Sequence, residues 1–260
     1  MADEVPLAQA KVFSDTMPQL DLMARSLFNG GASYTITLLN KTGASQSYAL
    51  FSQPPSVKPT VERLTSHAIL VARDVAARTG NAFFTFPRDK YHAICGVNQQ
   101  DDSVHLRVLD RCAVTLGSGR TSNFHRGTTC AMDASSATPF FASWAGPADD
   151  QGEIGAFCLR TPGGFTFEKA KNNHWIAGLG LSTSGNALVG IYASFTPGPR
   201  TDYQIGPSQV FYIVPRALDA NDPTPDDLDF SQECKLDFAS LSSSVELVHD
   251  DDNVIRIFNP

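Results

Sequence analysis

The fold is decided by residues 34–51, which read YTITLLNKTGASQSYALF. Tyr34, Ile36 and Leu38 alternate with polar threonines, so one face of an extended chain is apolar and the other carries hydroxyls. The tetrapeptide NKTG at 40–43 has the composition of a turn, and an extended pattern resumes after it. This stretch therefore predicts two β-strands joined as a hairpin.

The same signals recur along the chain, where β-branched and aromatic runs are bounded by Gly, Pro, Asn and Asp. Residues 61–78 fit either a helix or a strand at 67–71, and we favour the strand because its neighbours are strands. Since helices and strands do not alternate, the sequence predicts a mainly β protein, an antiparallel β-sandwich or a distorted barrel. Further strands are expected at 81–86, 91–97, 104–109, 112–116, 139–144, 154–160, 174–179, 188–195, 209–214, 244–249 and 254–258. The first two of these are expected to form another hairpin, and residues 250–253 are expected to form the turn between the last two.

The domain organisation is predicted to be simple. Residues 1–33 are expected to form an N-terminal extension with a short helical piece, because Leu20, Met23 and Leu27 recur at helical spacing. Residues 34–260 are expected to form a single β domain, because β-sandwiches of this length are often one unit.

Charge and hydropathy limit the partners. The chain of 260 residues has a formal net charge of −7 and no cluster of basic residues, so neither nucleic acid nor an anionic membrane surface is an expected partner. No run of about 18 apolar residues could span a membrane. The first residues include Asp3 and Glu4 and lack the apolar core of a secretory signal, so we expect a cytoplasmic location.

Cofactor and metal motifs are absent from the sequence. The five cysteines are odd in number and widely spaced, which favours reduced, mostly buried thiols. The six histidines show no ligand spacing typical of zinc, and no nucleophile-elbow, dinucleotide or phosphate-loop motif occurs. We therefore expect neither a metal nor a cofactor.

The polar stretch 118–129 is the first candidate site. It contains Arg120, His125 and Arg126 among glycines and hydroxyl residues. Guanidinium groups bind anions and an imidazole transfers protons, so such a loop could serve a substrate. A solvated loop without a function has the same composition, and that alternative stays open.

Two further segments carry candidate residues. Tyr91, on the strand expected at 91–97, could donate a proton to a substrate oxygen, whereas Cys95 is expected in the core. His174 and Trp175 could form the wall of a substrate pocket. The alternative is a strand in which Trp175 packs in the core and His174 lies at the surface.

Four blocks, at 34–51, 91–96, 175–180 and 202–207, resemble a group of small, mostly fungal, β-rich proteins of unassigned function. The resemblance implies a fungal cytosolic protein. It brings no set of catalytic residues with it.

Three functional hypotheses follow. Seventeen Phe, six Tyr and two Trp exceed what one buried layer requires, and could line a ligand pocket. The first hypothesis is a cofactor-independent cyclase or isomerase of secondary metabolism that acts on an apolar intermediate, with Tyr91, His125 and Arg126 polarising or protonating it. The second is a non-catalytic lectin-like or protein-binding β-sandwich that uses the loops at 118–129 and 219–229. The third is a structural protein whose aromatic residues pair in a homo-oligomer.

Overall fold

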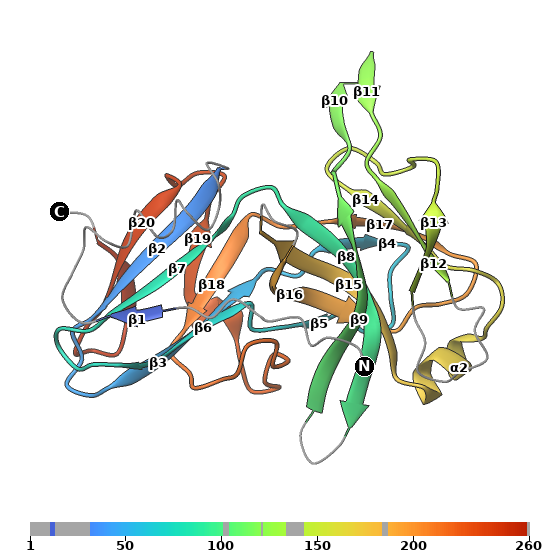
Figure 1. Ribbon diagram of the computed structural model, residues 1–260. Helices are drawn as coiled ribbons and strands as arrows, with labels where there is room; N and C mark the ends of the chain where they lie inside the picture. Colours follow the sequence, from blue (N-terminus) through green and yellow to red (C-terminus); the bar gives the residue numbers. More distant parts are fainter. Residues whose placement is uncertain are drawn as a thin grey trace.

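The computed structural model describes residues 11–13, 32–100, 104–120, 122–133, 143–183 and 187–258. The described chain is mainly β, with strands arranged in four larger sheets and one two-stranded hairpin (Figure 1). Most neighbouring strands are antiparallel, whereas β2 (Ser33–Asn40) with β20 (Ser244–His249) and β12 (Thr129–Asp133) with β14 (Phe157–Arg160) are parallel. None of the described sheets closes into a barrel, so the barrel alternative is wrong.

Sheets I and II form one half of the molecule (Figure 1). Sheet I has the order β1 (Lys11–Phe13), β7 (Asn81–Pro87), β2, β20 and β21 (Ile255–Ile257). Sheet II has the order β19 (Cys234–Asp237), β18 (Val210–Val214), β3 (Gln46–Ser52) and β6 (Leu70–Val75).

Sheets III and IV form the other half, with the short helix α2 (Phe167–Asn172) beside them (Figure 1). Sheet III has the order β5 (Thr65–Ser66), β16 (Leu188–Phe195), β15 (Trp175–Ser182), β8 (Tyr91–Gln100) and β9 (Val104–Val114). Sheet IV has the order β13 (Ser143–Pro147), β12, β14, β17 (Asp202–Gly206) and β4 (Ser56–Lys58). A 3-10 turn, η1 (Phe230–Gln232), precedes β19.

The expected alternation along β2 is confirmed, because Tyr34, Ile36 and Leu38 are buried and the residues between them are half-buried. The expected hairpin is wrong. β2 pairs with β7 and β20, whereas β3 pairs with β18 and β6, so the segment between them passes from sheet I to sheet II.

The side chain of Asn40 explains this corner. Its amide nitrogen donates to the carbonyls of Val75 and Ala76 at 2.9 and 3.1 Å, and its carbonyl oxygen accepts from the backbone N–H and the hydroxyl of Thr42 at 3.0 and 2.7 Å. The side chain therefore supplies the partners that a second strand would supply in a hairpin.

The second expected hairpin is also wrong, and for the same topological reason. β7 belongs to sheet I and β8 to sheet III, so the turn between them crosses from one half of the molecule to the other. The turn at 250–253 does join a true antiparallel pair, β20 and β21, in which Leu247 faces Ile257. The ambiguous segment 61–78 contains two strands, β5 and β6, and no helix.

One apolar cluster draws on all four sheets, through residues such as Tyr34, Phe211, Tyr192 and Phe157. The single domain expected for residues 34–260 stays a prediction. The expected helix around Leu20 lies outside the described residues. No helix in the described part of the chain is both long and apolar enough to cross a membrane.

We expect Asn40→Ala to destabilise the protein by about 3 kcal/mol, because it leaves buried carbonyl groups of the corner without donors. Urea denaturation measures the free energy of unfolding. Asn123→Ala, at an exposed position, is the matched control and should change that free energy by less than about 0.5 kcal/mol. Equal stability of the two variants would show that the corner does not depend on Asn40.

Candidate functional site

The most exposed regular element in the described part of the chain is a hairpin of β10 (Ser118–Arg120) and β11 (Asn123–His125). It projects away from sheets III and IV (Figure 1). Ser118 faces His125 across it. All of its described residues are exposed, so the hairpin contributes nothing to the apolar core.

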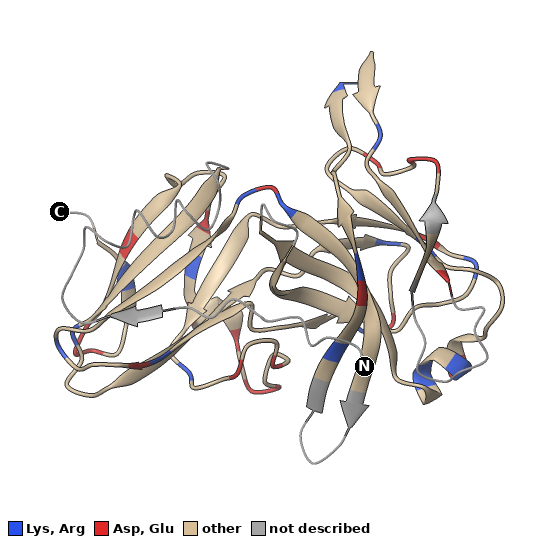
Figure 2. Ribbon diagram, viewed as in Figure 1, with Lys and Arg blue, Asp and Glu red and all other residues tan. Residues whose placement is uncertain are grey.

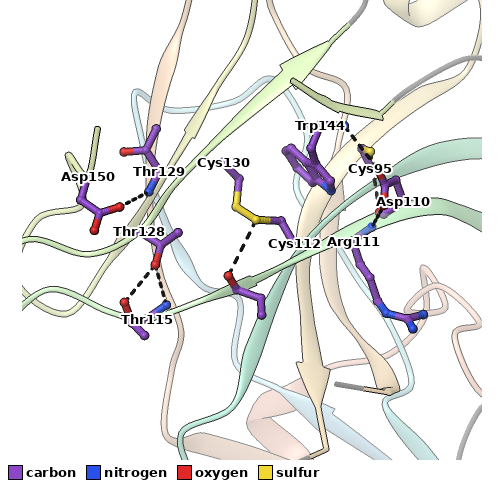
Figure 3. Close-up of a disulfide and its surroundings, with 11 residues drawn as sticks. Cys95, Asp110, Arg111, Cys112, Thr115, Thr128, Thr129, Cys130, Trp144 and Asp150 are labelled. Carbon is purple, nitrogen blue, oxygen red and sulfur yellow. Dashed lines mark hydrogen bonds between the residues drawn. A yellow bond between two sulfur atoms is a disulfide. The ribbon is translucent and has the colours of Figure 1, made fainter. Parts of the chain in front are cut away.

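The strands that flank the hairpin are joined covalently. β9 precedes β10 and β12 follows β11, and a disulfide between Cys112 of β9 and Cys130 of β12 connects these two strands with a Cα–Cα distance of 6.5 Å (Figure 3). Closer to the hairpin, the hydroxyl of Thr128 lies 2.9 Å from that of Thr115 and accepts from its backbone N–H at 3.0 Å. The backbone N–H of Thr128 donates in turn to the carbonyl of Thr115 at 2.9 Å.

At the base of the hairpin, glycine residues allow neighbouring backbone segments to come into direct contact. Gly127 and Gly152 exchange two backbone hydrogen bonds of 3.0 and 2.8 Å, and the N–H of Gly117 donates to Ala156 at 2.8 Å. A Cβ atom on Gly127 would lie 2.2 Å from the carbonyl oxygen of Ala156, and one on Gly117 would lie 2.1 Å from that of Glu153. Only glycine fits at these two positions, which allows the segments of the base to pack closely.

The hairpin and its base combine positive charge with apolar surface. The guanidinium of Arg126 lies 5.8 Å from the ring centroid of Phe124 and donates to Gln151 at 3.1 Å. Phe124 is 36% exposed, and Ile154, which pairs with Gly117 at the base, is 61% exposed. We call the following set the hairpin patch: Arg120, Phe124, His125, Arg126 and Ile154.

Charge around the hairpin patch is unevenly distributed. Figure 2 marks basic residues in the hairpin and acidic residues in the loop beside its base. That loop contains Asp149, Asp150 and Glu153, all exposed. The carboxylate of Asp150 accepts a hydrogen bond from the N–H of Thr129 at 3.2 Å, which connects the loop to β12. The chain as a whole is acidic, so the two guanidinium groups of the patch stand out from the surface around them.

The structure brings Arg120, His125 and Arg126 together on the hairpin, but it places Tyr91 elsewhere. Tyr91 is buried, its hydroxyl donates to the carbonyl of Arg88 at 3.1 Å, and its ring centroid is 6.0 Å from that of Tyr192. Burial raises the pKa of Tyr91 far above its ordinary value. The buried phenol and the exposed imidazole therefore share no surface that one substrate could contact.

His174 and Trp175 also lie outside the hairpin patch. Trp175 is 1% exposed, and it packs edge-on against Phe165 and under the ammonium group of Lys169. His174 is exposed between α2 and β15 and has a positive φ of 54°. Trp175 is thus a core residue and His174 a surface residue, the arrangement in which neither forms a pocket wall.

A buried serine–histidine pair was not expected from the sequence. Nε2 of His67 lies 2.9 Å from the hydroxyl of Ser194, and Nδ1 lies 3.0 Å from the carbonyl of Asn221. Burial lowers the pKa of His67 to about 4, so the imidazole is neutral at pH 7. A neutral imidazole oriented in this way can activate a serine hydroxyl.

The burial of this pair indicates a structural role. His67 and Ser194 are 3% and 4% exposed, and His67 also pairs with Pro223 of the segment that carries Asn221. The pair therefore fastens that segment to sheet III. No motif could have predicted it, because the two residues are 127 positions apart in the sequence.

The expectation of five reduced thiols is wrong, because Cys112 and Cys130 form the disulfide. Cys95, Cys158 and Cys234 are free. Cys95 lies in the core as expected, with its thiol 3.7 Å from the carbonyl of Asp110, and burial raises its pKa (Figure 3). Spacing could not pair the two bonded cysteines, because a non-local disulfide leaves no sequence pattern.

Comparisons of the chain with protein-family models, with curated proteins and with solved structures found no match. The resemblance to fungal proteins therefore stays a prediction. Among the described residues, no group of three or more His, Cys, Asp or Glu side chains could hold a metal ion.

We expect His67 to make the protein less stable in acid. Its pKa is about 4 in the folded chain against an ordinary 6.5, so the unfolded chain binds the proton first. This contribution is constant above about pH 6.5 and is lost as the pH falls toward 4, by roughly 3 kcal/mol. His67→Gln should flatten the pH dependence of the free energy of unfolding, measured by urea denaturation between pH 7 and 4.

His125→Gln is the control for this measurement, because His125 is exposed on the hairpin. It should retain the slope of the unaltered protein. If both variants keep that slope, the buried imidazole does not take part in acid sensitivity.

Proposed function

We propose that this protein is a non-catalytic binding protein, a β-sandwich in which the hairpin patch recognises an acidic surface of a partner protein. The observation that carries the proposal is a hairpin with a closely packed glycine base and no buried side chain among its described residues. Ordering each residue costs about 1–2 kcal/mol of backbone entropy, and a two-stranded hairpin is at best marginally stable alone. Burial on a partner would offset this cost.

The composition of the hairpin patch suits a protein interface. Arginine and aromatic residues are enriched at such interfaces and dominate their binding energy, whereas scattered surface residues contribute little. Arg126 stacks on Phe124 and is held by Gln151, so part of the patch is ordered before it binds. Guanidinium groups bind carboxylates in a bidentate way, which favours an acidic partner.

The acidic loop beside the base adds direction to this recognition. Asp149, Asp150 and Glu153 repel an acidic surface, whereas Arg120 and Arg126 attract it. An acidic partner would therefore contact Arg120 and Arg126 and keep its carboxylates away from the loop at 149–153. This arrangement also gives an association rate that falls as ionic strength rises.

The cyclase or isomerase hypothesis remains untested. Its motivation was the number of aromatic rings, and many of those rings contact one another in the structure. Phe211 alone lies within 4.8–6.3 Å, between ring centroids, of Tyr34, Phe86, Tyr192 and Phe238. Packing between sheets thus accounts for these five rings without a ligand chamber.

A protein array and a glycan array, probed with the labelled chain at micromolar concentration, test this function. We expect saturable binding to acidic proteins, weakened by added salt. Phe124→Ala and Arg126→Ala should each lower the affinity at least about tenfold, which corresponds to about 1.4 kcal/mol.

Arg63→Ala is the matched control, because Arg63 is a highly exposed arginine outside the hairpin patch. It should bind as the unaltered chain does. Saturable binding to glycans in place of proteins would overturn the proposed partner class. Binding that is indifferent to both hairpin variants would show that the hairpin is not the recognition element.

A further inference from the structure

The disulfide closes the loop that carries the hairpin patch. Cys112 and Cys130 are separated by 18 positions, and both β10 and β11 lie between them. Cys112 belongs to β9 at the edge of sheet III, and Cys130 belongs to β12 in sheet IV. The bond therefore joins sheets III and IV. We call the segment that it closes, residues 112–130, the arm.

The other links across the arm are non-covalent. Thr115 and Thr128 are joined by hydrogen bonds, and the glycine base contacts residues 152–156. A further link between the two sheets is the N–H of Trp144, which donates to the carboxylate of Asp110 at 3.3 Å (Figure 3). Breaking the covalent link would leave the arm held only by bonds that open in local fluctuations.

The two cysteines differ in exposure. Cys130 is 2% exposed, whereas Cys112 is half-buried, so Cys112 is the more accessible of the two to an incoming thiolate. Burial raises the pKa of all three free thiols, those of Cys95, Cys158 and Cys234, which keeps them protonated and poorly nucleophilic. Reduction therefore requires a thiol from outside the protein.

The chemistry balances with an external dithiol. One thiolate attacks Sγ of Cys112, the bond between the two cysteines breaks, and Cys130 leaves as a thiolate that takes up a proton. The second thiol of the reagent then attacks the mixed disulfide and releases Cys112 as a thiol. The reagent becomes a cyclic disulfide, and two electrons have passed to the protein.

We propose that the Cys112–Cys130 disulfide is a redox switch that sets the order of the arm and, resting on the proposed function, the affinity of the hairpin patch for its partner. The oxidised arm is held at its foot and presents an ordered patch. The reduced arm opens more often, so binding must also supply the cost of ordering it. In the cytoplasm, the location expected from the sequence, disulfides are usually transient and redox-sensing.

Hydrogen–deuterium exchange of the full chain, with and without dithiothreitol, tests the switch. The informative amides are those bonded within the arm and its base, at Thr115, Gly117, Gly127 and Thr128. We expect reduction to accelerate their exchange about tenfold. Amides of β3 in sheet II should keep their rates.

Two sets of variants control the experiment. The double variant Cys112→Ser, Cys130→Ser should exchange at the fast rate in both conditions. Cys234→Ser removes a free thiol and no bond, so it should respond to dithiothreitol as the unaltered protein does. Arm amides that exchange equally fast in both conditions would overturn the switch.

Exchange and binding fail independently. Faster exchange on reduction supports the switch in the arm even where the arrays show no partner. An array partner that binds the oxidised and reduced chains equally, with unchanged exchange, overturns the switch and leaves the proposed function standing. A partner bound at least tenfold more weakly by the reduced chain supports both.

Discussion

The structure depends on the packing of aromatic side chains between different sheets. The ring of Phe211, on β18 of sheet II, contacts Tyr34 and Phe86 of sheet I and Tyr192 of sheet III. Contacts between buried rings stabilise the fold by more than the burial of their apolar area alone. These contacts require neighbouring sheets to face one another. The chain meets this requirement by leaving one sheet and entering another at turns that would otherwise close hairpins.

This requirement explains which parts of the fold were predictable. Two-residue periodicity depends only on which face of a strand is buried, so strands such as β2, β7 and β16 were predicted correctly. The sequence did not predict the short strands β1, β4, β10, β11, β12, β17 and β19. The partner of each strand depends on contacts distant in sequence, and both early hairpins were therefore wrong. At the first corner, Asn40 and Thr42 are residue types that favour turns. Their side-chain hydrogen bonds stabilise a passage from sheet I to sheet II instead of a hairpin.

The candidate site shows the same division. The stretch 118–129 was singled out for its arginines and its histidine, and the structure shows that these are exposed on a projecting hairpin. Composition could not separate Tyr91 and Trp175 from that site, since an aromatic residue on a strand fits a pocket wall and a core equally well. Their burial depends on the sheets that cover them, which a single strand does not encode.

The glycine base and the disulfide also depend on contacts between residues distant in the sequence, so the sequence did not predict them. Both attach the hairpin to the rest of the protein. An element without buried side chains has no hydrophobic source of order, so its order must come from its attachment. Gly117 and Gly127 attach it through close backbone contact, and Cys112 with Cys130 attaches it covalently. The backbone contacts form in both redox states of the folded chain, whereas a disulfide with one half-buried cysteine can respond to its chemical surroundings. If the hairpin is the recognition element that we propose, attachment in both ways keeps its position and leaves its order open to regulation.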